Sequence, residues 1–226
     1  MLTLVLAESE LELMPQALFA HPAIASFAQQ RKKTPAQILL DSNYHHRAME
    51  TLPEGRRRGR PDIVHLFLLT ALESIVNKKG QLNVVIHTRH NDVISVSPET
   101  RIMRSYERFT GLMEQLFEHH VVPDEKHPLL RLRHNVTLQQ VVEHATADHI
   151  IVCSQSGKST SLATYFNELK KQKPHHLVCI IGGFPSGTFQ TDITTITHNV
   201  LSIYKEMLTV WTVAGEILVN YEVAAL

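Results

Sequence analysis

The sequence predicts an α/β protein with a mostly parallel β-sheet, and three observations support this fold class. Short apolar runs typical of buried strands occur at residues 150–153, 177–181 and 200–203. Helices are expected between and after these runs, at residues 160–171 and 206–221. The 226 residues are 43% hydrophobic, which is enough for a sizeable core. Strands that alternate with helices favour a parallel sheet covered on both faces.

The N-terminal quarter is expected to contain a strand, a helix and a surface excursion. Residues 3–7 form an apolar run that predicts a buried strand, and a helix is expected over residues 8–16. Residues 34–60 are polar and rich in charge and contain several prolines and glycines, which is typical of a surface excursion with limited structure. We therefore expect a single domain over residues 1–226 with a basic surface insertion at about 34–60.

A helix and a hairpin are expected after this excursion. Pro61 and Asp62 precede apolar residues at helical spacing, and Asp62 is of a residue type favoured at a helix N-cap. Two short apolar runs, residues 84–86 and 93–96, flank a polar stretch at residues 89–92. This pattern predicts a β-hairpin.

A further helix is expected over residues 102–119, with two distinct faces. Its apolar face is formed by Phe109, Leu112, Met113 and Leu116. A separate stripe is formed by Arg101, Arg104 and Arg108. At roughly 100° per residue this stripe lies beside the apolar face, so three guanidinium groups would face solvent or a partner. The alternative is a solvated face whose arginines pair with Glu99 and Glu107, which contributes little to stability.

Composition and charge limit the classes of protein to which the chain can belong. Lys plus Arg equals Asp plus Glu at 22 each, so overall charge favours no partner, although the arginines are clustered. The chain lacks an apolar run of about 18 residues and a signal-peptide pattern at its N-terminus. Cys153 and Cys179 lie in apolar runs, which indicates buried, unreactive thiols. We expect a cytoplasmic protein without a membrane anchor.

Glycines follow the apolar run at residues 177–181 and mark a candidate ligand loop. Gly182, Gly183 and Gly187 would let a ligand approach the backbone closely at the carboxyl end of a strand. A tight turn at the strand exit explains the same spacing equally well. The chain has no G-x-G-x-x-G, P-loop, G-x-S-x-G, H-E-x-x-H or C-x-x-C pattern, so no metal site is expected and hydrolase chemistry has no support.

Several motifs, in order along most of the chain, resemble one family. They are R-P-D-I-V-H at residues 60–65, I-H-T at 86–88, P-E-T-R-I-M-R-S-Y-E-R-F-T-G-L-M at 98–113, I-G-G-F-P-S-G at 181–187 and L-S-I at 201–203. The chain is similar there to the ribosome-biogenesis pseudouridine N1-methyltransferases, a SPOUT-class family. The arginine-rich motifs are specific enough to make a chance match improbable.

The resemblance implies a fold, an activity and partners. The fold would be a mostly parallel sheet with a C-terminal trefoil knot and an inserted lobe. The activity would be methyl transfer from S-adenosylmethionine to N1 of a pseudouridine in small-subunit ribosomal RNA. The partners would be that RNA, a second copy of the chain in a homodimer, and ribosomal proteins of the small subunit.

The resemblance also assigns site residues. The cofactor-binding positions would be Ser154, Gly182, Gly183, Phe184, Gly187, Leu201, Ser202, Ile203, Met207 and Leu208. The RNA-binding positions would be Arg60, Arg101, Arg104 and Arg108. The catalytic position would be Asp62, which either accepts the N1 proton or orients the base. A purely structural Asp62, capping a helix and paired with Arg60, is the alternative.

Two departures from the family pattern keep other functions open. The family often has small-Phe-x-His-Gly after the strand, whereas this chain has Gly-Phe-Pro-Ser-Gly at residues 183–187. The last loop usually contains Pro-Leu-Ser-Ala, whereas this chain has Lys-Glu-Met-Leu-Thr at residues 205–209. An RNA-binding assembly factor with weak or dispensable methyl transfer is therefore one alternative. A nucleotide-binding α/β protein of unrelated chemistry is another.

Overall fold

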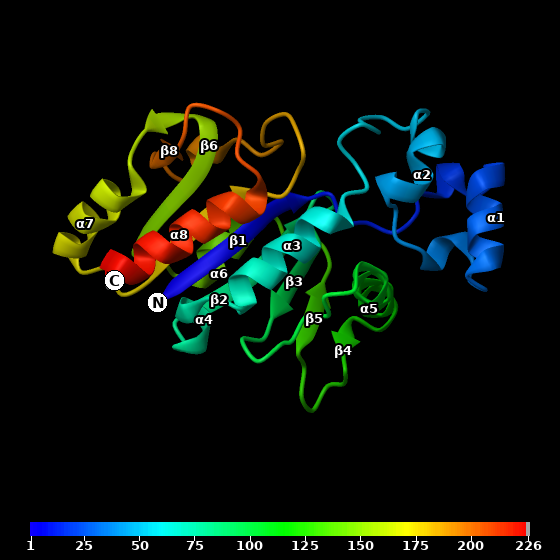
Figure 1. The fold of residues 1–226 in the computed structure, drawn as a ribbon, viewed down its shortest axis with the longest axis horizontal. Coiled ribbons are helices and arrows are strands. Elements are labelled where there is room, and N and C mark those ends of the chain that lie inside the picture. The colour runs from blue at the N-terminus through cyan, green and yellow to red at the C-terminus, as the bar shows by residue number, and fades with distance from the viewer. Residues whose placement is uncertain (225–226) are drawn as a thin grey trace.

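A single eight-stranded sheet organises the computed structural model, which describes residues 1–224 (Figure 1). The strand order is β4-β5-β3-β2-β1-β7-β6-β8. The strands are β1 Leu2–Ser9, β2 Leu82–Thr88, β3 Val93–Val96, β4 Val121–Val122, β5 Leu130–Arg133, β6 His149–Ser159, β7 Leu177–Gly182 and β8 Val200–Ser202. Strands β2, β1, β7, β6 and β8 run parallel, and β3, β5 and β4 add an antiparallel edge. The predicted mostly parallel sheet is confirmed.

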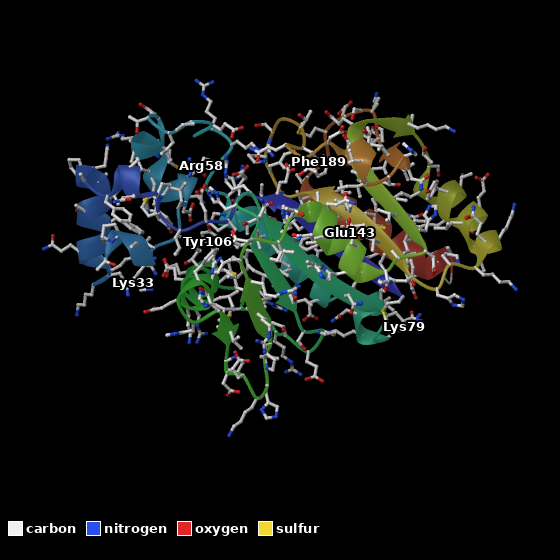
Figure 2. All side chains as sticks on the ribbon, turned by 180° about the vertical axis from the view of Figure 1, so that it is seen from behind. Lys33, Arg58, Lys79, Tyr106, Glu143 and Phe189 are labelled. Atoms are coloured by element: carbon white, nitrogen blue, oxygen red, sulfur yellow. The ribbon has the colours of Figure 1, made fainter. Side chains whose placement is uncertain are left out.

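Helices cover both faces of the sheet. The α-helices within residues 1–224 are α1 Pro22–Gln30, α2 Ser42–Met49, α3 Pro61–Leu72, α4 Ile75–Lys78, α5 Tyr106–His119, α6 Leu138–Ala145, α7 Leu162–Gln172 and α8 Val210–Ala224. Helices α3, α7 and α8 pack on one face with α5 at its edge, and α6, which carries Glu143, covers the other (Figures 1 and 2). In the part of the chain that the structure describes, no helix has the length and hydrophobicity that crossing a membrane requires.

The side chains of β1 show how the two faces are divided. Leu2, Leu4 and Leu6 belong to the core under α3 and α8, whereas Val5 and Ala7 belong to the core under α6. Successive side chains of a strand point to opposite faces, so a strand covered on both sides is apolar throughout. This explains the uninterrupted apolar runs from which the central strands were predicted.

Most predicted elements are confirmed, and three predicted helices, α5, α7 and α8, begin later than expected. The hairpin is formed by β2 and β3, which pair antiparallel. The helix expected from residue 160 begins at Leu162, because the Ser161 side chain caps it. The helix expected from residue 206 begins at Val210, and residues 203–209 form a loop instead.

The helix predicted at residues 8–16 is wrong. Strand β1 continues to Ser9, and the chain then runs on without a helix until a short 3₁₀ turn at Gln16–Leu18. The reason is the burial of three acids in this stretch: Glu8, Glu10 and Glu12 are all buried and pair with arginines. Glu8 itself has a φ of 51°, in the left-handed region, at the point where the pairing of β1 with β2 shifts register, and this backbone conformation does not belong to a regular helix.

The expectation of limited structure at residues 34–60 is also wrong, and the lobe is larger than that range. Helices α1 and α2 form a separate small lobe at the right of Figure 1. Its own core contains Met14, Leu18, Ile24, Ala28, Ile38, Leu40, Ala48, Met49 and Leu52. The surface is less basic than expected, because Arg57 and Arg58 are nearly buried against acids. Apolar residues spread among many charges concealed this core from sequence reasoning.

A buried glutamate attaches the lobe to α5. Glu114, whose side chain is 1% exposed, accepts hydrogen bonds from Arg31 at 2.6 and 2.9 Å and from Lys33 at 2.7 Å. Its Oε1 also accepts from the Leu39 backbone N–H at 3.2 Å. Two cations from the lobe therefore neutralise a carboxylate that the core of α5 would otherwise leave unpaired.

A buried histidine of the lobe, His45, makes the free energy of unfolding depend on pH. His45 is 2% exposed, and its Nδ1 accepts a hydrogen bond from the Asp41 backbone N–H at 3.0 Å. Burial, reinforced by the charge of Arg31, lowers the pKa of His45 from 6.5 to about 4. The folded protein therefore holds this ring neutral where the unfolded chain would bind a proton.

We predict that acidification from pH 6.5 to about 4 destabilises the protein through His45. The unfolded state binds the extra proton in this window, so the free energy of unfolding falls as pH decreases, by up to about 3 kcal/mol. His45→Gln should flatten the slope of stability against pH, as measured by urea denaturation. The exposed neighbour His46 is the control, and His46→Gln should keep the wild-type slope. Equal slopes for all three proteins would contradict the assignment.

Candidate functional site

A cavity of about 420 Å³ opens at the carboxyl ends of β6, β7 and β8. Three segments line most of it: residues 153–156 of β6, residues 181–189 after β7, and residues 201–213 from β8 into α8. Arg60 and Ile63, at the start of α3, complete the wall. In open parallel sheets this edge is where ligands bind, and the volume falls in the range of about 300–1,000 Å³ usual for small-molecule sites.

The structure brings most of the residues predicted to hold a cofactor into this cavity. Those that line it are Ser154, Gly182, Phe184, Gly187, Leu201, Ser202, Ile203, Met207 and Leu208. Gly183 is the exception. A Cβ at Gly183 would lie 2.5 Å from the Ser9 Oγ and 2.8 Å from the Ser9 Cα, so this glycine allows the end of β7 to pack on β1.

Sequence reasoning missed the role of Gly157, which shapes the β6 wall. The pairing of β6 with β8 shifts between Cys153 and Lys158, so the residues between them bulge from the strand toward the cavity. A Cβ on Gly157 would lie 2.6 Å from backbone atoms of Val200 and Leu201. Such a close approach between backbones requires glycine. The strand predicted from the sequence ends at residue 153, so Gly157 lies outside it, whereas β6 extends to Ser159.

The cavity combines apolar walls with a few polar groups. Ile181, Trp211 and Val213 provide apolar surface, and Ser154 and Ser202 provide hydroxyls. Trp211 and Val213 were expected on the final helix, but sequence reasoning did not assign them to the site. This mixture suits a ligand with an aromatic or aliphatic body and a few polar groups.

The cysteine in the wall is not a nucleophile. Cys153 lines the cavity, but burial raises the pKa of its thiol to about 12. The thiolate is the reactive form of cysteine, so this side chain stays unreactive near neutral pH.

Arg60, which lines the cavity, forms an ion pair with Asp62. The Arg60 Nε and Nη2 donate to the two carboxylate oxygens of Asp62 at 2.8 and 2.7 Å, and each side chain is 28% exposed. The hydrogen bond to Asp62 raises the pKa of Arg60 above its ordinary value. Asp62 lies in the first turn of α3 and Arg60 occupies the N-cap position, so the predicted N-cap role of Asp62 is wrong.

The predicted stripe of arginines on one helical face is wrong. Helix α5 begins at Tyr106, because the Ser105 side chain accepts a hydrogen bond from the Arg108 N–H and caps it. Arg101 and Arg104 therefore lie in the preceding loop, and only Arg108 is helical. All three are exposed, and no ion pair with Glu99 or Glu107 forms within residues 1–224.

Contacts between α3, α5 and the lobe place this arginine loop near Arg60. His65, one turn beyond Asp62 on α3, makes a 2.7 Å hydrogen bond between its Nε2 and the Met103 carbonyl oxygen, and its ring stacks on Phe109 at 4.5 Å. The Tyr106 hydroxyl donates to Asp41 of the lobe at 2.6 Å. Burial raises the pKa of Tyr106 and that of Asp41. The arginine loop is thus anchored to the helix that carries Asp62.

The sheet topology and this cavity define an α/β protein that binds a small molecule beside a basic surface. A solved structure has the same architecture: the Archaeoglobus fulgidus Nep1 bound to S-adenosylhomocysteine superimposes with a TM-score of 0.85 at 32% identity. The superposition covers 99% of this chain and 98% of that one.

Sequence comparison identifies the family. Residues 4–222 match the EMG1/NEP1 methyltransferase family. The ribosomal RNA small subunit methyltransferase Nep1 of Methanothrix thermoacetophila is 46% identical, covering 98% of this chain and 96% of its own. The protein of the same name from Pyrococcus furiosus is 45% identical over the same shares. The chain belongs to the EMG1/NEP1 methyltransferase family.

We predict that Gly157→Ala destabilises the protein by about 1–3 kcal/mol, because the added methyl group would press on backbone that cannot move aside. Gly111→Ala in α5 is the matched control. A Cβ there meets nothing within 4 Å, so alanine should stabilise the helix by up to about 1 kcal/mol. Urea denaturation of both variants measures the difference. A Gly157→Ala protein as stable as wild type would refute the close packing of β6 on β8.

Proposed function

We propose that this protein transfers a methyl group from S-adenosylmethionine to N1 of a pseudouridine in small-subunit ribosomal RNA, as a step in small-subunit biogenesis. The observation that carries the proposal is the position of Arg60, which lines the cavity and pairs with Asp62 beside the arginine loop. A ligand in the cavity and a nucleotide held by the arginines would therefore meet at Asp62. The names of the relatives, which specify small-subunit ribosomal RNA, support the same substrate.

The cavity fits the proposed methyl donor. Phe184, Leu201 and Leu208 offer apolar surface for a purine and ribose, and Ser154 and Ser202 offer hydroxyls for polar groups. When bound, S-adenosylmethionine supplies an electrophilic methyl group on a sulfonium. The protein's contribution is to hold the accepting nitrogen in line with that methyl group, which can supply roughly 7–11 kcal/mol of a barrier.

The exposed arginines suit RNA. Arg101, Arg104 and Arg108 are free to pair with phosphates, which guanidinium groups bind bidentately. Arginine also stacks on unpaired bases, and enzymes that modify a base take it out of the helical stack. Together with Arg60, these residues form the proposed RNA surface.

Two roles remain for Asp62, and both belong to the same proposal. N1 of pseudouridine carries a proton that must leave, and the Asp62 carboxylate, which pairs with the cavity-lining Arg60, is the group proposed to accept it. Alternatively Asp62 only fixes the guanidinium of Arg60, which occupies both carboxylate oxygens with one hydrogen bond each. Each oxygen keeps a second lone pair, so the ion pair does not block proton transfer.

An assembly factor with weak or dispensable methyl transfer is the second candidate. It is favoured by the loop at residues 205–209, where Glu206 places an acid in the cavity wall. Calorimetry with S-adenosylhomocysteine separates the two candidates, because a pure scaffold has no need to bind it. Competition by nucleotides instead would point to a nucleotide-binding protein.

We predict methyl transfer from labelled S-adenosylmethionine to a short RNA hairpin that contains pseudouridine, and none to the same hairpin with uridine. Uridine has no free N1, because that nitrogen carries the sugar. Equal labelling of the two hairpins would refute the pseudouridine assignment. Asp62→Asn distinguishes the two roles of Asp62: proton acceptance requires turnover to fall by about 10²–10⁴-fold with RNA affinity retained, whereas a positioning role affects RNA affinity as well.

We also propose a homodimer through the outer face of α8. Val219 and Val223 are 60% and 75% exposed, and Ile75 of the adjoining α4 is 57% exposed. The opposite face of α8 is buried through Ala214, Ile217, Leu218 and Tyr221. The outer face of α8 also exposes Thr212 and Glu216, so the apolar part is its C-terminal end together with Ile75. Large exposed apolar side chains at that end favour burial against a second copy, and a two-fold axis would pair this patch with itself. Ribosomal-protein partners and a cytoplasmic location stay predictions.

We predict that replacing both Val219 and Val223 by Glu yields a monomer, since like charges would face each other across the two-fold axis. Light scattering at micromolar concentration measures the mass. Tyr44→Glu, at an exposed aromatic of the lobe, is the control and should leave the dimer intact. A wild-type protein that is already monomeric under these conditions would refute the dimer.

A further inference from the structure

Arg57 contacts the wall of the cavity from outside. Its Nη1 donates to the Thr188 carbonyl oxygen at 2.7 Å, and its guanidinium carbon lies 3.9 Å from the centre of the Phe184 ring. Both Phe184 and Thr188 line the cavity, whereas Arg57 itself does not. The side chain is 10% exposed, so these contacts are largely shielded from water.

Two buried acids of β1 and its extension fix the Arg57 side chain. The Arg57 Nε donates to Glu10 at 2.7 Å, and its Nη2 donates to Glu8 at 3.3 Å. Glu10 is itself fully buried and also accepts from Arg89 at 2.7 Å. The guanidinium is therefore held from β1 and its extension, with its carbon over the Phe184 ring and its Nη1 toward Thr188.

Glu8 also holds the far end of the wall. The Glu8 carboxylate accepts hydrogen bonds from the backbone N–H groups of Gln190 and Thr191 at 2.7 and 2.8 Å. Residues 184–191 are thus attached at Phe184, at Thr188 and at the Gln190–Thr191 amides, always through Arg57 or Glu8. We call the contacts that Arg57 and Glu8 make with residues 184–191 the wall clamp.

We propose that Arg57 is a positioning residue for the methyl donor: through the wall clamp it holds residues 184–191 in the shape that admits the donor. This inference rests on the proposed function and adds a residue that touches neither donor nor RNA. Arginine is required, because lysine is a point charge that cannot stack on a ring while donating to a carbonyl and two carboxylates.

Arg58 provides a matched control for a merely structural ion pair. Its side chain is 11% exposed, and it donates to the buried Glu12 at 2.8 and 2.6 Å. It comes from the same segment and neutralises an acid of the same series, but its hydrogen bonds reach no residue of 184–191. Arg57→Lys and Arg58→Lys therefore perturb similar ion pairs, and only the first breaks the wall clamp.

The first test needs no ligand. Hydrogen exchange of the Gln190 and Thr191 amides should become at least about tenfold faster in Arg57→Lys, because their acceptor Glu8 loses its fixed partner. The rates in Arg58→Lys should match wild type. Should Arg57→Lys fail to fold, Glu8→Gln breaks the same clamp from its other side and should accelerate the same two amides. Unchanged exchange in the clamp variant that folds would overturn the proposal.

The second test measures the donor site by calorimetry with S-adenosylhomocysteine. The Kd should rise about tenfold in Arg57→Lys, and the KM for S-adenosylmethionine should rise with a smaller change in kcat, because only the shape of the wall is lost. Arg58→Lys should keep the wild-type Kd, even if its melting temperature falls. Equal Kd values for the two variants would refute the positioning role. Wild-type protein that fails to bind S-adenosylhomocysteine would instead refute the proposed function.

Discussion

The burial of three carboxylates, Glu8, Glu10 and Glu12, is the constraint on which the rest of the structure depends. An unpaired charge in the interior is costly enough that each acid must find a cation. Those cations come from distant segments: Arg57 and Arg58 precede α3, and Arg89 follows β2. Satisfying the acids therefore draws the end of the lobe, the hairpin turn and the central strand together.

The same ion pairs also hold part of the wall of the cavity. The carboxyl ends of β7 and β6 would create a crevice in any parallel sheet of this order, but its walls are loops. Residues 184–191 form one wall, which Arg57 and Glu8 attach to β1 through hydrogen bonds. Another wall is formed by the bulge of β6, after which Gly157 packs closely on the backbone of β8. The ion pairs that join the lobe to the sheet thus also hold part of the site.

How much the sequence predicts depends on the range of the interactions. Local apolar runs predict β1, β2, β3, β6, β7 and β8 but not the short edge strands β4 and β5, and Gly182 and Gly187 mark the site. The lobe core, the absence of an α-helix at residues 8–16 and the role of Gly157 depend on contacts between distant segments, which local patterns do not encode. The late start of α5 is different, because Ser105 is a visible cap that the arginine spacing outweighed.

The run of arginines before α3 shows how one residue type acquires two functions. Arg57 and Arg58 are nearly buried because acids at alternate positions of the β1 extension lie within their reach. Within residues 1–224, Arg60 pairs only with Asp62, its neighbour on the first turn of α3, and keeps 28% of its side chain exposed to solvent. A bidentate pair at that exposure fixes the guanidinium plane but leaves N–H groups for a further partner. Local charge alone does not separate the arginines available to RNA from those that hold the fold. The separation follows from which carboxylates the fold has already buried beside them.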